Sequence, residues 1–448
     1  MSAGDTIFAV SSGAGRAGVA VVRLSGPLCG HVVGKVTNRD LVARRFSVSD
    51  LRDPFTGELI DKAIGVWFPG PRSATGEDMC EFHVHGSEAV VSRLFDCFRK
   101  FPGLRLAVPG EFGRRAFANG KMDLVEVEGL GDLLDARTEG QRRLALRQMT
   151  GEASGIVEGW RGSLLSLLAR VDAAVEFGEE EGIAELALLS IREDLTALVG
   201  ELDAAVRRSS AAMALRDGIR VVLAGSPNTG KSSLLNVLAG RDAAIVSSRP
   251  GTTRDVVEVL LDLDGVPVLL RDTAGLREAS VDEIELIGMA RTRIAAADAD
   301  VVVWVWSDDI GGSWDVDPGV LPSIRVRSKA DLPRVKLDRI RNDSVCLESV
   351  ALSAATGEGI SGFLTVLSGL VRSRVDGWER AVVSHGRQVE ALSGSIRCLN
   401  DAMGRDAERL ELVAADLRGA ARFLGQITGH IDVEDWLDGI FSRFCIGK

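Results

Sequence analysis

The stretch "GSPNTGKSSLLN", residues 225–236, follows the apolar run "IRVVLA" at 219–224. The run is typical of a short buried strand and the segment after the loop is typical of a helix, so the "GxxxxGKS" pattern has the strand–loop–helix context that it needs. Its glycines let successive N–H groups turn toward phosphate oxygens, Lys231 neutralises the outer phosphates, and Ser232 is placed to ligate Mg²⁺. The alternative is a glycine-rich turn that precedes Lys-Ser by chance. Because both flanks fit, the stretch predicts a phosphate-binding loop.

The composition limits the class of protein. The chain has 448 residues, 46% of them hydrophobic, which suggests about three domains with their own cores. It has no apolar run of about 18 residues and no signal-peptide pattern, so we expect a cytoplasmic protein with no membrane contact. Six cysteines without CxxC spacing favour a reducing compartment over a zinc site or a disulfide framework. The net charge of −11 argues against indiscriminate nucleic-acid binding but leaves room for a local basic patch, such as "QRRLALRQ" at 141–148.

The pattern around the loop suggests an inserted domain. Residues 219–372 alternate strands and helices, with a hairpin signal at Asp264-Gly265, as in a doubly wound α/β domain. Apolar residues at helical spacing form one stripe before this segment and another after it. The stripes are Leu195, Leu198, Leu202 and Val206, then Leu410, Val413, Leu417, Ala420, Leu424 and Ile427. If the stripes pack on each other, the α/β core is inserted into a helical domain. Residues 1–120 are instead rich in strands, turns and glycine.

Two patterns near the N-terminus have competing interpretations. "GAGRAG" at 13–18 matches a dinucleotide-binding fingerprint, but the β-branched strand "VAVVRLSG" follows where the fingerprint requires a helix. "EFHVH" at 81–85 places Glu81, His83 and His85 on one face of a strand, where three ligands could hold a metal. Without a further ligand, the preferred interpretation is a polar strand face that lines a pocket.

Four further segments identify the nucleotide. "DTAG" at 272–275 supplies an Asp that reaches Mg²⁺ through water and a Gly N–H that senses the γ-phosphate, and "PGTTRD" at 250–255 supplies switch hydroxyls. "SKAD" at 328–331 matches the guanine-reading NKxD pattern with Ser in place of Asn. Its Asp331 can accept two hydrogen bonds from the guanine edge, which adenine does not offer. "SAA" at 353–355 fits the loop that closes over the base. Each segment is weak alone, but their order and spacing predict GTP and GDP as ligands.

The whole chain resembles one family, the tRNA-modification GTPases called MnmE or TrmE. The resemblance rests on "DTIFAVSSGAGRAGVAVVRLSG", "TGEDMCEFHVHG", "PGEFGRRAFANGKMDLVEVEGLGDLLDA", "DTAGLREA" and the terminal "FCIGK", of which the last is highly specific. It implies GTP hydrolysis that supports carboxymethylaminomethyl or aminomethyl modification of the wobble uridine in certain tRNAs. It also implies a homodimer, a heterotetramer with the FAD-dependent MnmG (GidA) protein, and 5-formyl-tetrahydrofolate or a related folate as one-carbon donor.

The resemblance implies a multidomain fold that is partly α/β and partly all-α. Residues 1–120 would form an α+β domain that binds folate and dimerises. Residues 216–374 would form an inserted Ras-like P-loop GTPase domain. Residues 121–215 and 375–448 would be the two parts of one helical domain, the second ending in the "FCIGK" motif. This layout agrees with the insertion suggested by the apolar stripes.

Site residues are assigned motif by motif from the resemblance and the nucleotide segments. The expected nucleotide contacts are Asn228, Thr229, Gly230, Lys231, Ser232, Ser233, Ser247, Ser248, Arg249, Pro250, Gly251, Thr252, Thr253, Asp272, Thr273, Ala274, Gly275, Ser328, Lys329, Asp331, Ser353 and Ala354. The expected Mg²⁺ ligands are Ser232, Thr253 and Asp272. The expected K⁺ ligands, mostly through carbonyl oxygens, are Asn228, Ser247, Arg249 and Thr252. The expected folate contacts are Arg23, Glu81, Lys121 and Lys448. Arg and Lys suit the glutamate carboxylates of a folate, and Glu can pair with the N–H edge of the pterin.

Two departures bear on the mechanism. Ser328 stands where the family usually has Asn, and a hydroxyl replaces only part of the amide's hydrogen bonding to the base and the phosphate loop. We therefore expect weaker guanine affinity without loss of specificity. Leu276 stands where Ras-like GTPases place the glutamine that orients the attacking water. The resemblance nominates Glu285 for the water and K⁺ for the charge, although a solvated helix residue is the alternative for Glu285. The expected catalytic residues are Glu285, Lys231, Thr253 and Gly275.

Two other classes of function stay open. The chain could be a GTP-binding assembly switch, for instance in ribosome maturation, whose output is a conformation. It could also be a folate-dependent one-carbon transferase that uses the GTPase domain only for regulation. Recovery of an FAD-containing partner and of modified tRNA would argue against the first class. Folate binding with catalytic turnover by residues 1–120 alone would favour the second.

Overall fold

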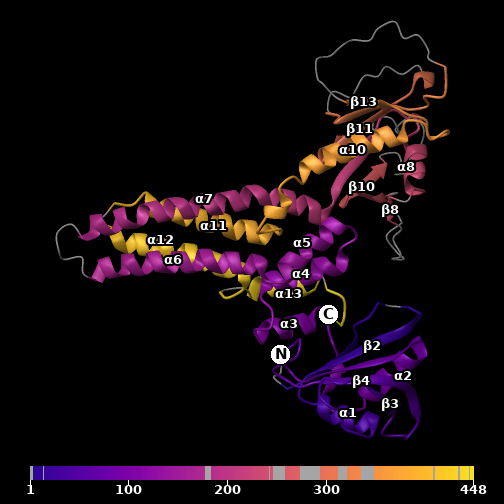
Figure 1. The fold of residues 1–448 in the computed structure, drawn as a ribbon, viewed down its shortest axis with the longest axis vertical. Coiled ribbons are helices and arrows are strands. Elements are labelled where there is room, and N and C mark those ends of the chain that lie inside the picture. The colour runs from indigo at the N-terminus through magenta and orange to yellow at the C-terminus, as the bar shows by residue number, and fades with distance from the viewer. Residues whose placement is uncertain are drawn as a thin grey trace. The chain divides into compact units, whose positions relative to one another are not determined.

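The computed structural model describes residues 4–13, 15–176, 183–241, 243–245, 258–272, 293–310, 320–333, 348–406, 409–431, 434–442 and 444–447. Contacts divide the chain into two compact units, each with its own sheet (Figure 1). The first unit comprises Met1–Gly131, Gln148–Leu168 and Leu417–Lys448, and the second comprises Asp132–Arg147 and Ala169–Asp416. In the described ranges, no helix is both long enough and apolar enough to cross a membrane.

The sheet of the first unit has six strands in the order β3-β4-β5-β2-β1-β6. The strands are β1 (Thr6–Val10), β2 (Ala17–Ser25), β3 (Ser47–Arg52), β4 (Leu59–Phe68), β5 (Met79–Gly86) and β6 (Leu104–Leu106). Neighbouring strands are antiparallel except β1 and β6, which are parallel. Because β2 begins at Ala17, inside the "GAGRAG" segment, the expectation of a strand rather than a helix there is confirmed.

Helices cover this sheet and continue from it. They are α1 (Cys29–Thr37), α2 (Glu88–Phe98), α3 (Glu111–Ala118), α4 (Leu124–Asp135) and α13 (Glu434–Phe441). The core between the sheet and α1 and α2 contains the fully buried rings of Phe8, Phe82 and Phe98. Helices α3 and α13 are in contact, and Gly110 before α3 leaves no room for a Cβ against Phe441. Two segments far apart in the sequence therefore pack together within this unit.

The second unit contains a seven-stranded sheet in the order β13-β12-β11-β7-β10-β9-β8. Its strands are β7 (Ile219–Ala224), β8 (Ala244–Ile245), β9 (Glu258–Leu263), β10 (Val266–Asp272), β11 (Val301–Trp306), β12 (Ile324–Arg327) and β13 (Glu348–Ala351). The pairs from β13 to β10 are parallel, and β9 and β8 add antiparallel strands at one edge. The predicted hairpin joins β9 and β10, where Asp264 and Gly265 both have positive φ (55° and 86°), as a two-residue type I′ turn requires.

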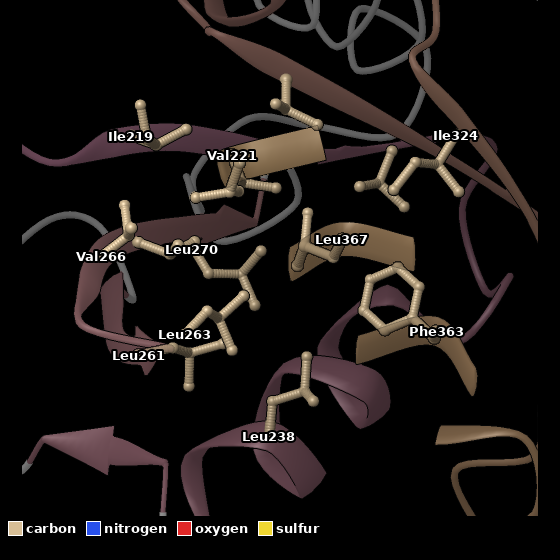
Figure 2. Close-up of a cluster of buried hydrophobic side chains, with 14 of the residues drawn as sticks. Ile219, Val221, Leu238, Leu261, Leu263, Val266, Leu270, Ile324, Phe363 and Leu367 are labelled. Carbon is tan, nitrogen blue, oxygen red and sulfur yellow. The ribbon is translucent and has the colours of Figure 1, made fainter. Parts of the chain in front are cut away.

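Helices α8 (Lys231–Ala239) and α10 (Ile360–Arg374) pack in the core of this α/β sheet. Figure 2 shows Val221 and Leu270 of the sheet beside Leu238 of α8 and Phe363 and Leu367 of α10. All five side chains are at most 1% exposed. A parallel sheet buried on both faces gives continuous apolar runs such as the "VVVWVW" of β11. The predicted α/β fold is therefore present around the phosphate-loop segment.

Further helices are described outside the two sheets. They are α5 (Glu139–Met149), α6 (Glu152–Glu176), α7 (Ile183–Asp217), α11 (Gly386–Met403) and α12 (Leu410–Thr428), with the 3₁₀ helices η2 (Asp308–Ile310) and η3 (Trp378–Arg380). The first apolar stripe lies on α7 and is buried except for the half-buried Val206, and the second is buried on α12. Helix α11 packs along α7, and Arg216 at the end of α7 donates a hydrogen bond to the carbonyl of Ser384 (2.7 Å) (Figure 1). The stripe analysis did not single out α11.

The segment "QRRLALRQ", expected to offer a basic patch, lies in α5. Arg142 pairs with Glu139 at 2.8 Å, and the guanidinium of Arg143 lies 5.3 Å from the centre of the Trp378 ring. Arg147 donates to a backbone carbonyl of η3. Arg142 and Arg143 remain exposed, so the basic patch at 141–148 stays a prediction.

Candidate functional site

Glycines shape the loop between β7 and α8. Gly225 has a φ of +138°, and a Cβ at this position would overlap the carbonyl oxygen of Val305 on β11. Gly230 has a φ of +91° and precedes the first residue of α8. Asn228, between them, is exposed and also left-handed, with a φ of +61°. The loop therefore turns at the N-terminus of α8, where backbone N–H groups without helical partners favour an anion.

Polar side chains gather where α8 begins. Lys231 is 5% exposed, and its ammonium donates to the carbonyls of Gly225 (2.9 Å) and Ser226 (2.8 Å). Burial lowers the pKa of Lys231, and the nearby Asp272 opposes that shift. The hydroxyl of Ser232 donates to Asp272 at the end of β10 (2.5 Å). Two of the predicted Mg²⁺ ligands are thus neighbours, and oxygen groups of this kind suit Mg²⁺.

The predicted base-reading loop lies against the phosphate loop. Ser328, which follows β12 and is 4% exposed, donates its hydroxyl hydrogen to the carbonyl of Thr229 (2.5 Å). The same hydroxyl lies 3.0 Å from the carbonyl oxygen of Trp306, but it has only one hydrogen to donate. Thr229 is itself held by a hydrogen bond from its hydroxyl to the carbonyl of Ser226 (2.9 Å). The serine that replaces the usual asparagine therefore keeps a direct link to the phosphate loop.

The other predicted base contacts surround this link. Ala330 donates its N–H to the carbonyl of Leu352 (3.0 Å), which places the "SKAD" loop beside the "SAA" loop. Ser353 is fully buried and accepts a hydrogen bond from a backbone N–H, whereas Asp331 is exposed. Lys329 is half-buried and pairs with Asp309. Because β12 and β13 are parallel neighbours, both loops emerge at the same edge of the sheet.

The remaining predicted nucleotide contacts are less informative. Ser233 is exposed in the first turn of α8, and Ala354 is half-buried. The other predicted residues lie outside the described part of the chain. They are Ser247, Ser248, Arg249, Pro250, Gly251, Thr252, Thr253, Thr273, Ala274, Gly275, Glu285 and, at the C-terminus, Lys448.

In the first unit, two predicted folate contacts form a pair. Arg23 on β2 lies directly opposite Glu81 on β5, and its Nε and Nη2 atoms lie 2.9 and 2.8 Å from Oε1 of the carboxylate. The guanidinium lies 5.8 Å from the centre of the Phe112 ring on α3. The second carboxylate oxygen of Glu81 faces His83 Nε2 at 3.6 Å. Both members of the pair are partly exposed, so a ligand with acidic and N–H groups can reach opposite charges at one place.

One further predicted folate contact, Lys121, and the last described residue, Gly447, lie near the strands of this sheet. Lys121 follows α3, and its Cε would lie 3.3 Å from a Cβ placed on Gly76. The tail reaches the sheet, because Gly447 abuts the carbonyl of Val10 at the end of β1 so closely that a Cβ would overlap it. β1 is the strand next to Arg23. The residue before the C-terminal lysine therefore lies beside the strand that borders the Arg23–Glu81 pair.

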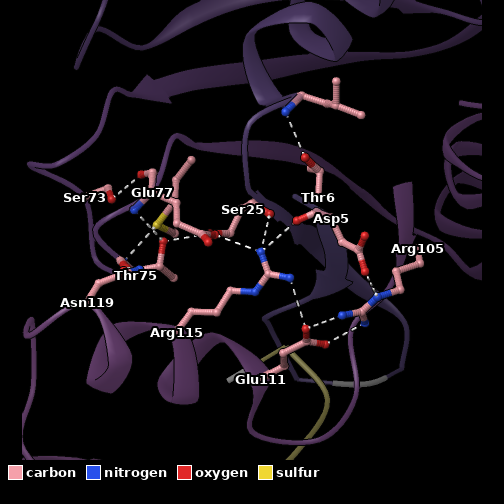
Figure 3. Close-up of polar contacts among 12 residues, drawn as sticks. Asp5, Thr6, Ser25, Ser73, Thr75, Glu77, Arg105, Glu111, Arg115 and Asn119 are labelled. Carbon is pink, nitrogen blue, oxygen red and sulfur yellow. Dashed lines mark hydrogen bonds and ion pairs between the residues drawn. The ribbon is translucent and has the colours of Figure 1, made fainter. Parts of the chain in front are cut away.

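A polar network fixes α3 on the sheet (Figure 3). Arg115 donates to Glu77 (2.9 Å) and to Glu111 (3.1 Å), and Arg105 donates to both carboxylate oxygens of Glu111 (2.5 and 2.8 Å). Glu111 is 1% exposed. Burial alone raises the pKa of Glu111, but hydrogen bonds from Arg105, from a backbone N–H and from Arg115 outweigh it and leave that pKa lowered. The carboxylate is therefore charged, and it holds the helix that carries Phe112.

Comparison with known proteins decides the family. The family model described as "MnmE helical domain" matches residues 124–445, and the one described as "GTP-binding protein TrmE N-terminus" matches residues 6–121. The chain belongs to the MnmE family. The tRNA modification GTPase MnmE of Methylobacterium sp. (strain 4-46) is 46% identical over 450 residues, which cover 99% of this chain and 100% of that protein. MnmE of Parvibaculum lavamentivorans is 45% identical over 99% of this chain, and MnmE of Mesorhizobium japonicum is 44% identical over 100% of it; each is itself covered completely.

Sequence analysis missed several residues of this MnmE-family site. Phe112 and Arg115 lie inside the quoted MnmE motif "PGEFGRRAFANGKMDL", which could have pointed to them. Asp309, which pairs with Lys329, and Ser307, which donates to Asp309, follow β11 in a segment without a recognisable motif. Their place beside the "SKAD" loop depends on which strands are neighbours, and the sequence carries no local signal for it.

Proposed function

We propose that this chain binds GTP between β7 and α8 and hydrolyses it, and that hydrolysis supports modification at C5 of the wobble uridine of certain tRNAs. The observation that carries the nucleotide assignment is the hydrogen bond from Ser328 to Thr229, because it sets the base-reading loop against the phosphate loop. The name of the relatives, tRNA modification GTPase, supports both parts of the proposal. The group added to the uridine is carboxymethylaminomethyl or aminomethyl.

Each group around the nucleotide has a distinct task. Lys231 and the N–H groups at the start of α8 stabilise the negative charge that builds on the phosphates. Ser232 and Asp272, which already share a hydrogen bond, suit Mg²⁺, and Thr253 is the third expected ligand. When bound, Mg²⁺ shields the phosphate oxygens from one another. Glu285 orients the attacking water, with Gly275 at the γ-phosphate, because Leu276 has no group that could do so.

Potassium is the proposed source of positive charge near the bridge between the β- and γ-phosphates. Asn228 is exposed in the phosphate loop and has a side-chain oxygen to offer. Carbonyl oxygens of Ser247, Arg249 and Thr252 are the further expected ligands. Na⁺ is smaller, and the loop would have to contract around it. A rate that rises with KCl and much less with NaCl is therefore expected.

The carbon donor, 5-formyl-tetrahydrofolate or a related folate, is proposed to bind at Arg23 and Glu81, with Lys121 and Lys448. The proposal includes a folate-binding, dimerising domain at 1–120, an inserted GTPase domain at 216–374, and a helical domain made by the segments on either side of it. The homodimer joins the FAD-dependent MnmG protein in a heterotetramer in the cytoplasm. The position of Gly447 beside β1 supports a folate site that includes the C-terminal lysine.

The test combines nucleotide selectivity with the state of the tRNA. The full chain should hydrolyse GTP and not ATP, faster in KCl than in NaCl at matched ionic strength. Cells that lack the chain should lose the C5 group on the wobble uridine, as measured by mass spectrometry of tRNA. Unchanged tRNA with intact GTPase activity would favour an assembly switch. Equal use of ATP and GTP would overturn the guanine assignment.

A further inference from the structure

An acidic side chain after β11 holds the lysine of the base-reading loop. One carboxylate oxygen of Asp309 accepts a hydrogen bond from the ammonium of Lys329 (2.7 Å), and the other accepts one from the hydroxyl of Ser307. The bonds from Lys329 and Ser307 lower the pKa of Asp309, so the carboxylate is charged at neutral pH. Ser307 is 3% exposed and follows the last residue of β11. The carboxylate is therefore fixed to the sheet on one side and to Lys329 on the other.

The backbone of Lys329 is already held in place. Its φ of +52° is left-handed, an unusual conformation for a residue other than glycine. The N–H of Ser328 donates to the carbonyl of Trp306 (2.8 Å), and the N–H of Ala330 donates to the carbonyl of Leu352 (3.0 Å). The lysine stem, in contrast, has four rotatable bonds, and an unrestrained lysine loses much entropy when it is ordered. The contact with Asp309 orders that stem before any nucleotide arrives.

The serine at position 328 makes the contact between Asp309 and Lys329 more important for nucleotide binding. An asparagine amide can donate two hydrogen bonds, whereas the Ser328 hydroxyl donates one, which it gives to Thr229. The loop therefore has fewer bonds of its own with which to present a purine-binding surface. We propose that Asp309 is a positioning residue for guanine nucleotides, which holds the aliphatic stem of Lys329 where it lies along the base. This rests on the proposed function, since it takes guanine binding by the "SKAD" loop as given.

A neighbouring ion pair provides a matched control. Asp308 precedes Asp309 in η2, and Arg327 lies two positions before Lys329. Asp308 and Arg327 form an ion pair at 3.0 Å. The Asp308 pair does not involve a side chain of the "SKAD" loop. Asp308→Asn and Asp309→Asn remove the same charge from the same short helix. A general effect of charge near the nucleotide would appear in both variants, and an effect through Lys329 only in the second.

The experiment measures the affinity of the full chain for GDP, IDP and ADP by competition with a fluorescent guanine nucleotide. Asp309→Asn should weaken GDP binding about 5-fold, the size expected for one partly exposed charge-assisted hydrogen bond. The stem of Lys329 lies along the purine ring, which GDP and IDP share, and not against the amino group that Asp331 reads and that IDP lacks. Asp309→Asn should therefore weaken GDP binding and IDP binding by the same factor. Asp309→Glu, which keeps the charge, should recover part of the loss, and Asp308→Asn should change affinity less than about 2-fold, because its partner Arg327 lies outside the "SKAD" loop.

A double-mutant cycle separates positioning from a general structural role. In a Lys329→Met background, Asp309→Asn should have no further effect, because the stem is no longer tied to the carboxylate. A further loss there, or a changed ratio of GDP to IDP affinity, would mean that Asp309 supports the whole loop and would overturn the inference. If the parent chain prefers GDP to ADP and Asp309→Asn binds GDP as tightly as the parent does, the inference alone is overturned. A parent chain that binds ADP as tightly as GDP overturns the proposed function first.

Discussion

The two candidate sites of this chain are built in opposite ways. The phosphate loop occupies consecutive residues, 225–232, and presents mainly backbone N–H groups shaped by glycines. The Arg23–Glu81 pair joins side chains that are 58 positions apart in the sequence and that meet because β2 and β5 are neighbours in register. A site made of backbone depends on which conformations the chain can adopt. A site made of side chains depends on charge and on strand register.

This difference predicts how each site fails. At the phosphate loop, an added methyl group should lower nucleotide affinity more than a change of charge outside the loop, because the backbone leaves no room for the methyl group. At the Arg23–Glu81 pair, methyl groups are tolerated and charge is decisive. The three predictions below test this comparison, beginning with the largest expected effect.

Gly225→Ala should have the largest effect. Its Cβ would overlap the carbonyl oxygen of Val305, and the φ of +138° is strained for any residue other than glycine. The loop must shift, so we expect GDP affinity to fall about 100-fold or more, or about 3 kcal/mol. Isothermal titration calorimetry with GDP measures this. Gly240→Ala is the control, since Gly240 ends α8 with a φ of −87° and the nearest atoms lie 3.7 Å from an added Cβ. Equal affinities for both variants would contradict a loop set by backbone shape.

The fold was predictable from the sequence where local chemistry decides it. The "VVVWVW" run became β11, Asp264-Gly265 became the turn between β9 and β10, and the "GxxxxGKS" loop lies where its flanks place it. The pairing of α7 with α11 was not predicted, because α11 carries small and polar residues such as those of "LSGSIR" and has no continuous apolar stripe. Arg23 was found only through the resemblance, whereas Glu81 was also singled out by the "EFHVH" pattern as part of a polar strand face. No local pattern could bring them together, since strand register is set by the whole sheet.

Glu111→Gln should have the next largest effect, on stability rather than on nucleotide binding. It removes the buried counter-charge that Arg105 and Arg115 share and leaves them the partly exposed Asp5 and Glu77, which we expect to cost about 2–3 kcal/mol. Because the folded pKa of Glu111 is lowered, its contribution is complete above the unfolded value of about 4.3 and is lost as pH falls below it. The gap in urea midpoint between parent and variant should therefore narrow as the solution is acidified from neutral pH to below about 4.

Hydrogen exchange localises that effect. The peptides that cover β6 and α3 should exchange faster in Glu111→Gln, while those of β7 and α8, in the other unit, should not change. Glu139→Gln is the matched control, because Glu139 forms an exposed pair with Arg142 and should contribute little to stability. A stability gap that is constant with pH would show that the Glu111 charge has no part in holding α3.

Exchange of the two charges in the Arg23–Glu81 pair should have the smallest effect on the stability of the fold. It should separate the contribution of the pair to stability from its contribution to ligand binding. Arg23→Glu or Glu81→Arg alone puts like charges opposite each other across β2 and β5, with an expected loss of about 1 kcal/mol. The double exchange restores opposite charges in register, so the thermal midpoint should return to near that of the parent. Affinity for 5-formyl-tetrahydrofolate should nevertheless stay about 10-fold lower, or about 1.4 kcal/mol, because the cation no longer lies over Phe112 and the carboxylate has moved to the other strand. Titration calorimetry with the folate measures the affinity, and differential scanning calorimetry of the same samples measures the thermal midpoint. If the double variant recovered folate affinity together with stability, the orientation of the pair would have no role, and the first unit would bind its ligand through net charge alone.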